Sequence, residues 1–532
     1  MSEIAVSARQ GAPEETSADT RVVGLFDGES LGSELSALAE PGEASGKPRR
    51  LAVTHEEGGR RVIVVGLGPR SSFDAEAARV AAAVAAARAR ELSARSLSWA
   101  VPAGAGVAGA LVEGTLLGLY KFDAFKTSAD DAESPEITSL EVVAELDVAD
   151  AVSQARVRAE AQNAARDLQN LPSNVATPEF LAERAEAIAG EFDSVSFEAL
   201  GREEIVERGM GAFAAVAQGS YAEPRLIVLR YDGGGAGAGS ALPHVAFVGK
   251  AVTFDTGGIS IKPSAKMHEM KFDMSGGAAV LEAMRAIAAL EIPVRITAVV
   301  PATENMPSGR SMKPGDIVTA MNGKTIEINN TDAEGRLILA DALAYAVAEG
   351  AERVVDLATL TGAIVIALGS TYAGLFSNDD GWCGEVEAAS TATGELGWRL
   401  PLHPEYFELT KGQYADLTNA SEQRKASSIY AAEFLRQFVD DRPWVHVDIA
   451  GTAWGVGRPY VGSGASGFGV RMLIELAQRA AALPPGGDGA AQGGSPGVTG
   501  ADATGAGATG GGPPTAGAPP AGATPTDTPD ES

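Results

Sequence analysis

The stretch from Val245 to Pro263 reads VAFVGKAVTFDTGGISIKP, and its first five residues form a short apolar run that ends at a glycine. Such a run predicts a buried strand, Val245–Gly249. A helical pattern, Ala278–Leu290, and a further apolar run, Val294–Pro301, follow along the chain. Strands that alternate with helices in this way indicate an α/β domain with a mixed, mostly parallel sheet covered by helices.

The same alternation continues to about residue 483 and predicts the remaining elements of this domain. The dipeptide Asn322-Gly323 is typical of a tight hairpin turn, because both residue types tolerate the positive φ angles that such a turn requires. The further elements predicted are the hairpin strands Asp316–Ala320 and Thr325–Asn329, the helices Arg336–Ala348 and Gly467–Ala482, and the strands Arg353–Leu357 and Trp444–Ile449.

Composition divides the whole chain into four parts. Residues 1–150 predict a smaller N-terminal α/β domain, because apolar runs alternate there with an alanine-rich helical stretch. Residues 151–176 form a connecting helix and a proline-interrupted linker, which lead to the larger domain at residues 177–483. Residues 484–532 have no aromatic and no basic residue and cannot bury enough apolar surface to offset chain entropy, so we expect a disordered tail. The clearest elements of the first two parts are the strands Arg21–Phe26 and Arg61–Gly66 and the helices Ala75–Ala94 and Ala149–Gln169.

Charge and composition limit the classes of function. The chain has 42 basic and 70 acidic side chains and a net charge of −28. A polyanion of this kind repels phosphate backbones, so neither nucleic acid nor an anionic membrane is an expected partner. The single cysteine, Cys383, excludes an intramolecular disulfide framework and a cysteine-rich zinc site. Neither a signal-peptide pattern nor an apolar run that could span a bilayer is visible, so a cytoplasmic protein is expected.

Charged residues gather in segments that are typical of turns. Lys250 follows the predicted strand Val245–Gly249, Asp255 and Asp273 come soon after it, and Asp332 and Glu334 lie between a strand and a helix. Ligands of open α/β sheets bind beyond the carboxyl ends of the strands, so we expect these loops to meet in one cleft. Four carboxylates in one cleft would repel one another unless a cation compensated them. A pair of divalent metal ions held by bridging carboxylates supplies that compensation.

These residues also form a recognisable pattern, because Asn330–Leu337 reads NTDAEGRL. This octapeptide resembles, without a break, the signature of the leucyl aminopeptidase (cytosol aminopeptidase) family, and the resemblance extends from about residue 160 to 482. It implies a two-domain fold and a metal-dependent aminopeptidase that hydrolyses the N-terminal residue of peptides, preferably Leu or another apolar residue, with a water activated by two metal ions. The further matching segments are ARDLQNLPSN (165–174), VGKAVTFDTGGISIKP (248–263), DLATLTGA (356–363), HVDIAGTAW (446–454) and SGFGVRML (466–473).

The resemblance also implies a role for each matching residue. One metal ion would be held by Asp255, Asp332 (side chain and main-chain carbonyl) and Glu334, and the other by Lys250, Asp255, Asp273 and Glu334. Lys262 would stabilise the negatively charged tetrahedral intermediate, and Arg336 would hold a bicarbonate that acts as the general base. The main chain at Leu360 would orient the peptide. The pocket for the first side chain would be lined by Met270, Thr359, Gly362, Ala450 and Ala453, although Met270 and the two alanines fit ordinary core positions almost equally well.

Two departures from the family pattern leave these ligands in place. Ala251 stands where the family usually has Gly, and Thr256 where Ser is common. Family resemblance further implies a homohexamer that acts on peptide substrates. The ions would be Mn²⁺ or Zn²⁺, because carboxylate-rich sites accept several divalent metals.

Two other functions compete with this interpretation. The segment Gly462–Gly467 reads GSGASG and precedes a helix, which is typical of dinucleotide-binding oxidoreductases, but the run before it is a poor strand. Some members of the resembled family act as DNA-binding regulators, so a binding protein is the second alternative. The net charge of −28 argues against the second alternative.

Overall fold

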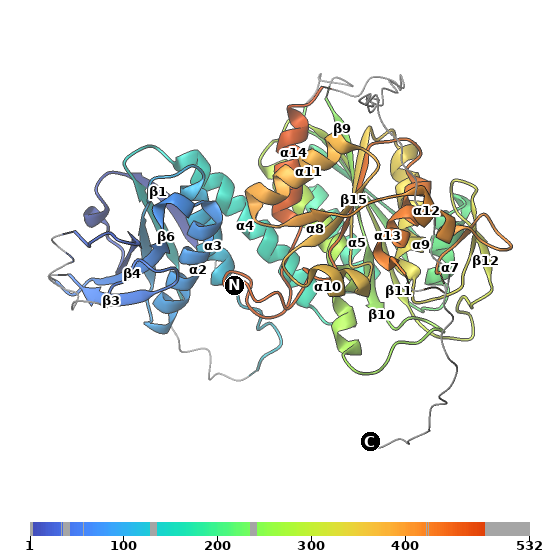
Figure 1. The fold of residues 1–532 in the computed structure, drawn as a ribbon, viewed down its shortest axis with the longest axis horizontal. Coiled ribbons are helices and arrows are strands. Elements are labelled where there is room, and N and C mark those ends of the chain that lie inside the picture. The colour runs from blue at the N-terminus through green and yellow to red at the C-terminus, as the bar shows by residue number, and fades with distance from the viewer. Residues whose placement is uncertain are drawn as a thin grey trace, which may run out of the picture. The chain divides into compact units, whose positions relative to one another are not determined.

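The computed structural model describes residues 4–484, except for 33, 34, 36–42, 57, 128–135, 235–241, 422 and 424. The tail predicted to be disordered begins at residue 484, and its remainder from 485 onward lies outside the described residues. The chain up to Gly486 forms one compact unit, which contains two large β-sheets covered by helices and a third, small sheet (Figure 1). The expected two-domain α/β fold is confirmed.

The N-terminal sheet has six strands in the order β1-β6-β5-β2-β4-β3. All neighbouring strands are parallel except the edge pair β3 and β4. Asp74 caps α2, because its carboxylate accepts a hydrogen bond from the Ala77 N–H at 2.8 Å. The bounds are β1 Ala5–Gln10, β2 Thr20–Phe26, β3 Leu51–His55, β4 Arg61–Gly68, α2 Ala75–Glu91, β5 Ser96–Ala100, α3 Val107–Gly118 and β6 Ser139–Ala144.

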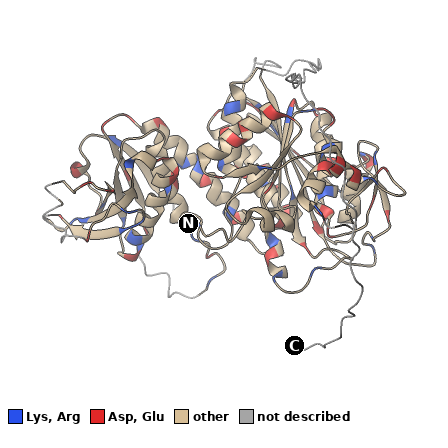
Figure 2. Ribbon diagram, in the orientation of Figure 1, with Lys and Arg blue, Asp and Glu red and all other residues tan. Residues whose placement is uncertain are grey.

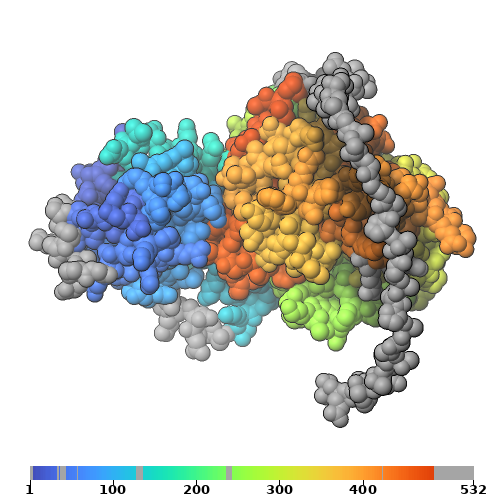
Figure 3. Space-filling view, viewed as in Figure 1, coloured from blue at the N-terminus to red at the C-terminus, as the bar shows by residue number. Residues whose placement is uncertain are grey.

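Helix α4 (Ala149–Asn170) connects this sheet to the next one, as its pattern predicted. It ends before Pro172, which cannot continue a helix. In the space-filling view the blue N-terminal part touches the red C-terminal segment (Figure 3). A buried ion pair lies in this contact, where the Arg471 guanidinium is 3.2 Å from the Glu113 carboxylate. Acidic and basic residues are interspersed along the ribbon of both parts (Figure 2).

The larger sheet has nine strands in the order β16-β15-β18-β14-β9-β11-β8-β7, with β10 paired to β11 off this path. Its centre is parallel from β18 to β11, and β8, β7 and β15 run antiparallel to their inner neighbours. The strands are β7 Val195–Leu200, β8 Arg225–Asp232, β9 His244–Gly249, β10 Ala251–Asp255, β11 Arg295–Asn305, β14 Arg353–Ala358, β15 Ala373–Ser377, β16 Gly397–Arg399 and β18 Trp444–Asp448.

Helices cover both faces of the larger sheet. One face packs on residues from α4, α5, α8, α11 and α14, and the other on residues from α7, α9 and α13. The hairpin predicted around Gly323 pairs β12 with β13, and β17 extends it to a third small sheet. The bounds are α5 Pro178–Glu191, α6 Arg202–Glu207, α7 Gly211–Ala217, α8 Ser275–Ala289, β12 Ile317–Thr319, β13 Thr325–Glu327, α9 Glu334–Ala348, α10 Gly362–Leu368, α11 Asp380–Thr393, α12 Pro404–Phe407, β17 Leu417–Thr418, α13 Ser427–Leu435 and α14 Val470–Ala481.

Three helix starts differ from the prediction. Helix α8 begins at Ser275 rather than Ala278, because Gly276 and Gly277, which disfavour a helix when judged from sequence, lie in its first turn. Helix α9 begins at Glu334 rather than Arg336, because a carboxylate in the first turn interacts favourably with the helix dipole. Helix α14 begins at Val470 rather than Gly467, because Gly467 and Gly469 have positive φ angles of 67° and 100°. The glycine-rich segment before α14 follows a turn and not a strand, so the dinucleotide-binding alternative lacks the strand–turn–helix unit that it requires.

Asp341, in the middle of α9, makes the stability of the fold depend on pH. Its buried carboxylate accepts hydrogen bonds from the Phe213 N–H at 2.8 Å and the Met321 N–H at 2.7 Å. Burial raises its pKa to about 7, although these N–H groups partly offset the shift. The folded state therefore holds the proton more tightly than the unfolded state does. This contribution to stability is complete below about pH 4 and is lost as the pH rises through 7.

We expect Asp341→Asn to remove this pH dependence. The shift corresponds to roughly 4 kcal/mol, at about 1.4 kcal/mol for each pKa unit. The free energy of unfolding of the variant should therefore rise relative to wild type by up to that amount between pH 4 and pH 8. Urea unfolding of both proteins at several pH values measures the difference. A difference that stays constant with pH would contradict the assignment.

Candidate active site

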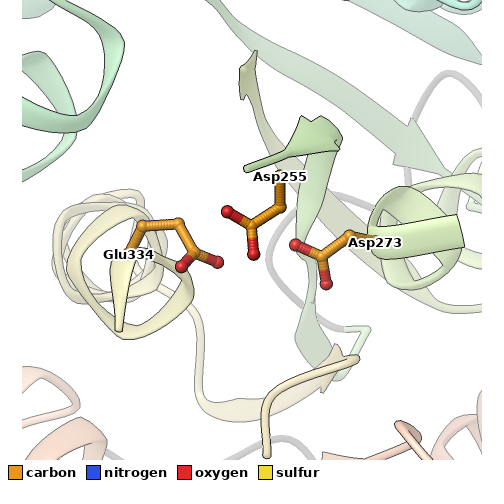
Figure 4. Close-up of side chains that lie close together, drawn as sticks. All are labelled: Asp255, Asp273 and Glu334. Atoms are coloured by element: carbon orange, nitrogen blue, oxygen red, sulfur yellow. The ribbon is translucent and has the colours of Figure 1, made fainter. Parts of the chain in front are cut away.

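Five charged side chains converge at the carboxyl ends of the central strands. Lys250 directly follows β9, Asp255 is the last residue of β10, and Glu334 is the first residue of α9. Asp273 lies in the 3₁₀ turn Met267–Met274, and Asp332 precedes α9. Figure 4 shows the carboxylates of Asp255, Asp273 and Glu334 pointing toward one another from these three elements. One oxygen from each lies within 4.8 Å of the others.

Two glycines make this convergence sterically possible. A Cβ atom on Gly335 would lie 2.7 Å from the Lys250 Nζ atom, so a side chain there would displace the ammonium group. Gly257 has a φ of +84°, and a Cβ atom on it would lie 2.7 Å from the Asp332 carboxylate. Gly257 and Gly335 therefore leave room for the charged groups beside them.

Two lysines neutralise part of the acidic cluster. The Lys250 Nζ atom lies 2.9 Å from Asp273 and 2.8 Å from Glu334. The Lys262 Nζ atom lies 2.8 Å from Asp255 and 2.5 Å from Asp332. The four carboxylates therefore outnumber the two ammonium groups.

The pKa values of these groups reflect both burial and mutual interaction. Burial opposes the charged form of Lys250, but Asp273 and Glu334 outweigh it and raise its pKa. Burial, reinforced by Glu334, raises the pKa of Asp255. Burial likewise raises the pKa of Asp273 well above its usual range and that of Asp332 to about 6. Carboxylates whose ionised forms are disfavoured in this way are stabilised by an added cation.

The donor set fits divalent metal ions. Within the described part of the chain, the buried oxygens Oδ2 of Asp273 and Oε2 of Glu334 have no hydrogen-bond partner. Buried polar atoms are normally paired, so unpaired carboxylate oxygens in an acidic cluster indicate metal-ligand positions. Lys250 coordinates a metal only as the neutral amine, so loading an ion beside it must release its proton.

A cavity of about 530 Å³ opens over the cluster, and most of the predicted site residues line it. Arg336 instead lines an adjoining cavity of about 290 Å³, whose wall shares Asp332 and Leu360 with the first. Ala453 is fully buried in the hydrophobic core and does not line either cavity. The predicted residues on the larger cavity are Lys250, Asp255, Lys262, Met270, Asp273, Asp332, Glu334, Thr359, Leu360, Gly362 and Ala450.

Several residues of the site had not been predicted. Asn305, the last residue of β11, donates from Nδ2 to the Asp255 carboxylate at 2.8 Å and to the Thr331 carbonyl at 3.0 Å. Glu269 and Trp454 line the larger cavity. The position of Asn305 at a strand's carboxyl end was the available signal, because polar residues at such ends commonly face a ligand.

The comparison with known proteins identifies the family. The model of the cytosol aminopeptidase family's catalytic domain matches residues 163–474, and the model of its N-terminal domain matches residues 5–129. This chain belongs to the cytosol aminopeptidase family. It is a metal-dependent aminopeptidase, a hydrolase that releases N-terminal residues from peptides. Among the described residues, no helix is both long and apolar enough to cross a membrane.

Relatives and solved structures resemble the chain over most of its length. The probable cytosol aminopeptidase of Roseiflexus castenholzii is 45% identical, with 88% of this chain and 98% of that protein covered. The probable cytosol aminopeptidase of Solibacter usitatus is 44% identical, with 86% of this chain and 96% of that protein covered. A mutant of tomato leucine aminopeptidase has a TM-score of 0.80 at 34% identity, with 90% and 97% covered. The bottromycin maturation enzyme BotP in complex with Mn has a TM-score of 0.78 at 36% identity, with 87% and 99% covered.

Proposed function

We propose that this aminopeptidase uses two divalent ions, Mn²⁺ or Zn²⁺, to release N-terminal Leu and other apolar residues from peptides. The observation that carries the proposal is the buried cluster of Asp255, Asp273 and Glu334 at the floor of the larger cavity. Its surplus of negative charge and its unpartnered oxygens support a metal site. A neighbouring structure, BotP, is named as a complex with Mn, which supports manganese as one of the ions.

The ligands would be shared between the two ions. One ion would bind Asp255, Glu334 and both the side chain and the carbonyl of Asp332, and the other Lys250, Asp255, Asp273 and Glu334. When bound, such a pair lowers the pKa of a water molecule and polarises the substrate carbonyl. The Asn305 amide holds the Asp255 carboxylate in place from behind, as partners of metal ligands commonly do.

Lys262 and Arg336 would act on the reacting atoms. The Lys262 ammonium would stabilise the negative charge that develops on the scissile carbonyl oxygen. Arg336 would hold a bicarbonate as general base in the adjoining cavity. Its Nη1 donates to the Asn419 carbonyl at 2.8 Å, while its buried Nε has no partner among the described residues, so one N–H remains for an anion.

The main chain at Leu360 would orient the peptide, and apolar side chains support the preference for Leu. Met270, Val365 and Ala450 line the larger cavity, together with Thr359 and Gly362. Ala453 lies in the core and would influence this pocket only through its neighbours.

The proposal also covers the oligomeric state of the protein and its location in the cell. We propose a homohexamer in the cytoplasm, on family resemblance. We propose peptides as substrates and no nucleic-acid partner, because a net charge of −28 repels phosphate. We further propose that residues 177–483 form the catalytic domain and residues 1–150 the N-terminal domain, with 151–176 between them.

The test is hydrolysis of Leu-, Asp- and Arg-p-nitroanilide by purified protein that has been stripped of metal and then given Mn²⁺ or Zn²⁺. We expect activity to return with metal, and Leu to be released at least about tenfold faster than Asp or Arg, as the burial of an apolar side chain predicts. Fastest turnover of Asp or Arg would contradict the apolar pocket. If the re-metallated protein released no N-terminal residue at all, the proposed function would fail.

A further inference from the structure

The loop Thr359–Gly362 links the metal cluster to both cavities. The Thr359 carbonyl accepts a hydrogen bond from the Lys250 Nζ atom at 2.9 Å, and the Thr359 hydroxyl donates to Asp273 at 2.7 Å. Leu360, Thr361 and Gly362 line the larger cavity and the adjoining one. Two of the proposed ligands therefore depend on the position of this loop.

One buried carboxylate holds that loop. Asp448 is the last residue of β18, and its backbone lies opposite Ala358, the residue before the loop. Its Oδ1 atom accepts from the N–H groups of Leu360 at 3.1 Å and Thr361 at 3.4 Å, and its Oδ2 atom accepts from the Thr361 hydroxyl at 2.6 Å. The remaining contact, from the Ala450 N–H at 3.3 Å, fixes the turn after β18.

Burial of the Asp448 carboxylate destabilises the folded protein, so folding alone does not explain why an acidic residue stands at this position. Asp448 is fully buried, and the charged interaction that favours its ionised form comes from the buried His446 rather than from a lysine or arginine. Burying such a charge is unfavourable unless it is well paired, and an apolar residue of similar size is often the more stable choice. Buried charges of this kind are instead expected where the site must be held in one geometry.

We infer that Asp448 is a positioning residue that holds the Thr359–Gly362 loop so that Thr359 can orient Lys250 and Asp273. Asp448 touches no proposed ligand itself and acts through the loop. The consequence for hydrolysis rests on the proposed function. The consequence for metal binding concerns the ligands alone and can be measured separately.

The experiment compares Asp448→Ala and Asp448→Asn with a matched control. Asparagine keeps one acceptor oxygen, but the NH₂ group that replaces the other oxygen cannot accept from the Thr361 hydroxyl. Asp356→Asn is the control, because Asp356 is a buried carboxylate on the neighbouring strand that bonds the Trp444 indole and the His446 ring and not the loop. For each full-length protein we would measure the Kd for Mn²⁺ by titration of the metal-free form, kcat and KM for Leu-p-nitroanilide, and the unfolding temperature.

We expect Asp448→Ala to weaken Mn²⁺ binding and lower kcat by roughly 10–100-fold, as for other groups that orient metal ligands. Asp448→Asn should recover part of both losses, while Asp356→Asn should lower only the unfolding temperature. Thr361→Val removes the hydroxyl bond to Asp448 without removing the carboxylate, and it also removes the contacts of that hydroxyl with the Ser428 hydroxyl and the Ile364 N–H. The part of its effect on Kd and kcat that acts through Asp448 should not add to that of Asp448→Asn.

The inference is overturned if the Asp448 variants lose stability but keep the wild-type Kd and kcat, or if Asp356→Asn changes these quantities as much as they do. If an Asp448 variant does not fold, Thr361→Val provides the same comparison. A wild-type protein that binds Mn²⁺ but releases no leucine would refute the proposed function. The Kd comparison would still decide the role of Asp448.

Discussion

Replacing Glu334 with glutamine is expected to abolish metal binding and peptide hydrolysis together. Glu334 is the first residue of α9, is almost fully buried, and would bridge the two ions. Glutamine keeps its shape but removes the charge, so Lys250 would lose one of the two carboxylates beside it. A metal centre contributes several kcal/mol to the transition state, and each 1.4 kcal/mol is tenfold in rate. We therefore expect kcat/KM to fall by roughly 10³-fold or more.

Metal content after dialysis and kcat/KM for Leu-p-nitroanilide measure this effect. The matched control is Glu282→Gln, which removes another buried helical carboxylate. Glu282 forms a two-pronged ion pair with Arg184, with distances of 2.7 Å and 2.8 Å, and does not line the cavities of the site. It should lower the unfolding temperature and leave metal content and kcat/KM close to wild type. A Glu334→Gln protein that kept both ions would show that Glu334 is not a bridging ligand.

The central part of the fold could be predicted from the sequence because its signals are local. The run Val245–Gly249 is apolar and short, and it ends where a charged loop begins, which is typical of a buried parallel strand. The acidic residues in the turn segments were predicted to meet in one cleft, and the structure brings Asp255, Asp273 and Glu334 together. Placement at a strand end was only part of the signal, because Asp255 ends β10 whereas Asp273 comes from the 3₁₀ turn Met267–Met274 and Glu334 from the first turn of α9.

The remaining features depend on contacts between distant residues. Asp448 lies inside the strand predicted at Trp444–Ile449, and the sequence does not indicate which segment its carboxylate contacts. Only the pairing of β14 with β18 brings it to the loop at Leu360. Asn305 supports Asp255 because β10 pairs with β11, and the shift of register within that pairing is not visible in the sequence. Ala453 was predicted to line the pocket but lies in the core, because a small apolar residue near a motif fits a pocket wall and a core position equally well.

Lys262 is expected to behave differently from Glu334 when it is replaced. Its ammonium lies 2.8 Å from Asp255 and 2.5 Å from Asp332, and only part of the side chain is exposed. If ions bind these carboxylates, they compete with the ammonium for them, which leaves it available to the substrate carbonyl. Lys262→Met should therefore preserve metal binding and lower kcat by roughly 10²–10³-fold, the typical cost of removing a group that stabilises a developing oxyanion. KM should change little, because the interaction forms mainly in the transition state.

Separate determination of kcat and KM, together with Mn²⁺ titration, distinguishes the roles of Lys262 and Glu334. Lys271→Met serves as the control, because Lys271 is a nearby, partly buried lysine whose ammonium donates to the Asn170 carbonyl at 2.7 Å, away from the cavity. It should change kcat by less than about threefold, since it removes no group that faces the substrate. If Lys262→Met lost its metal, Lys262 would be supporting the ligands rather than the transition state. If it retained both metal and kcat, the oxyanion would have to be stabilised by the ions alone.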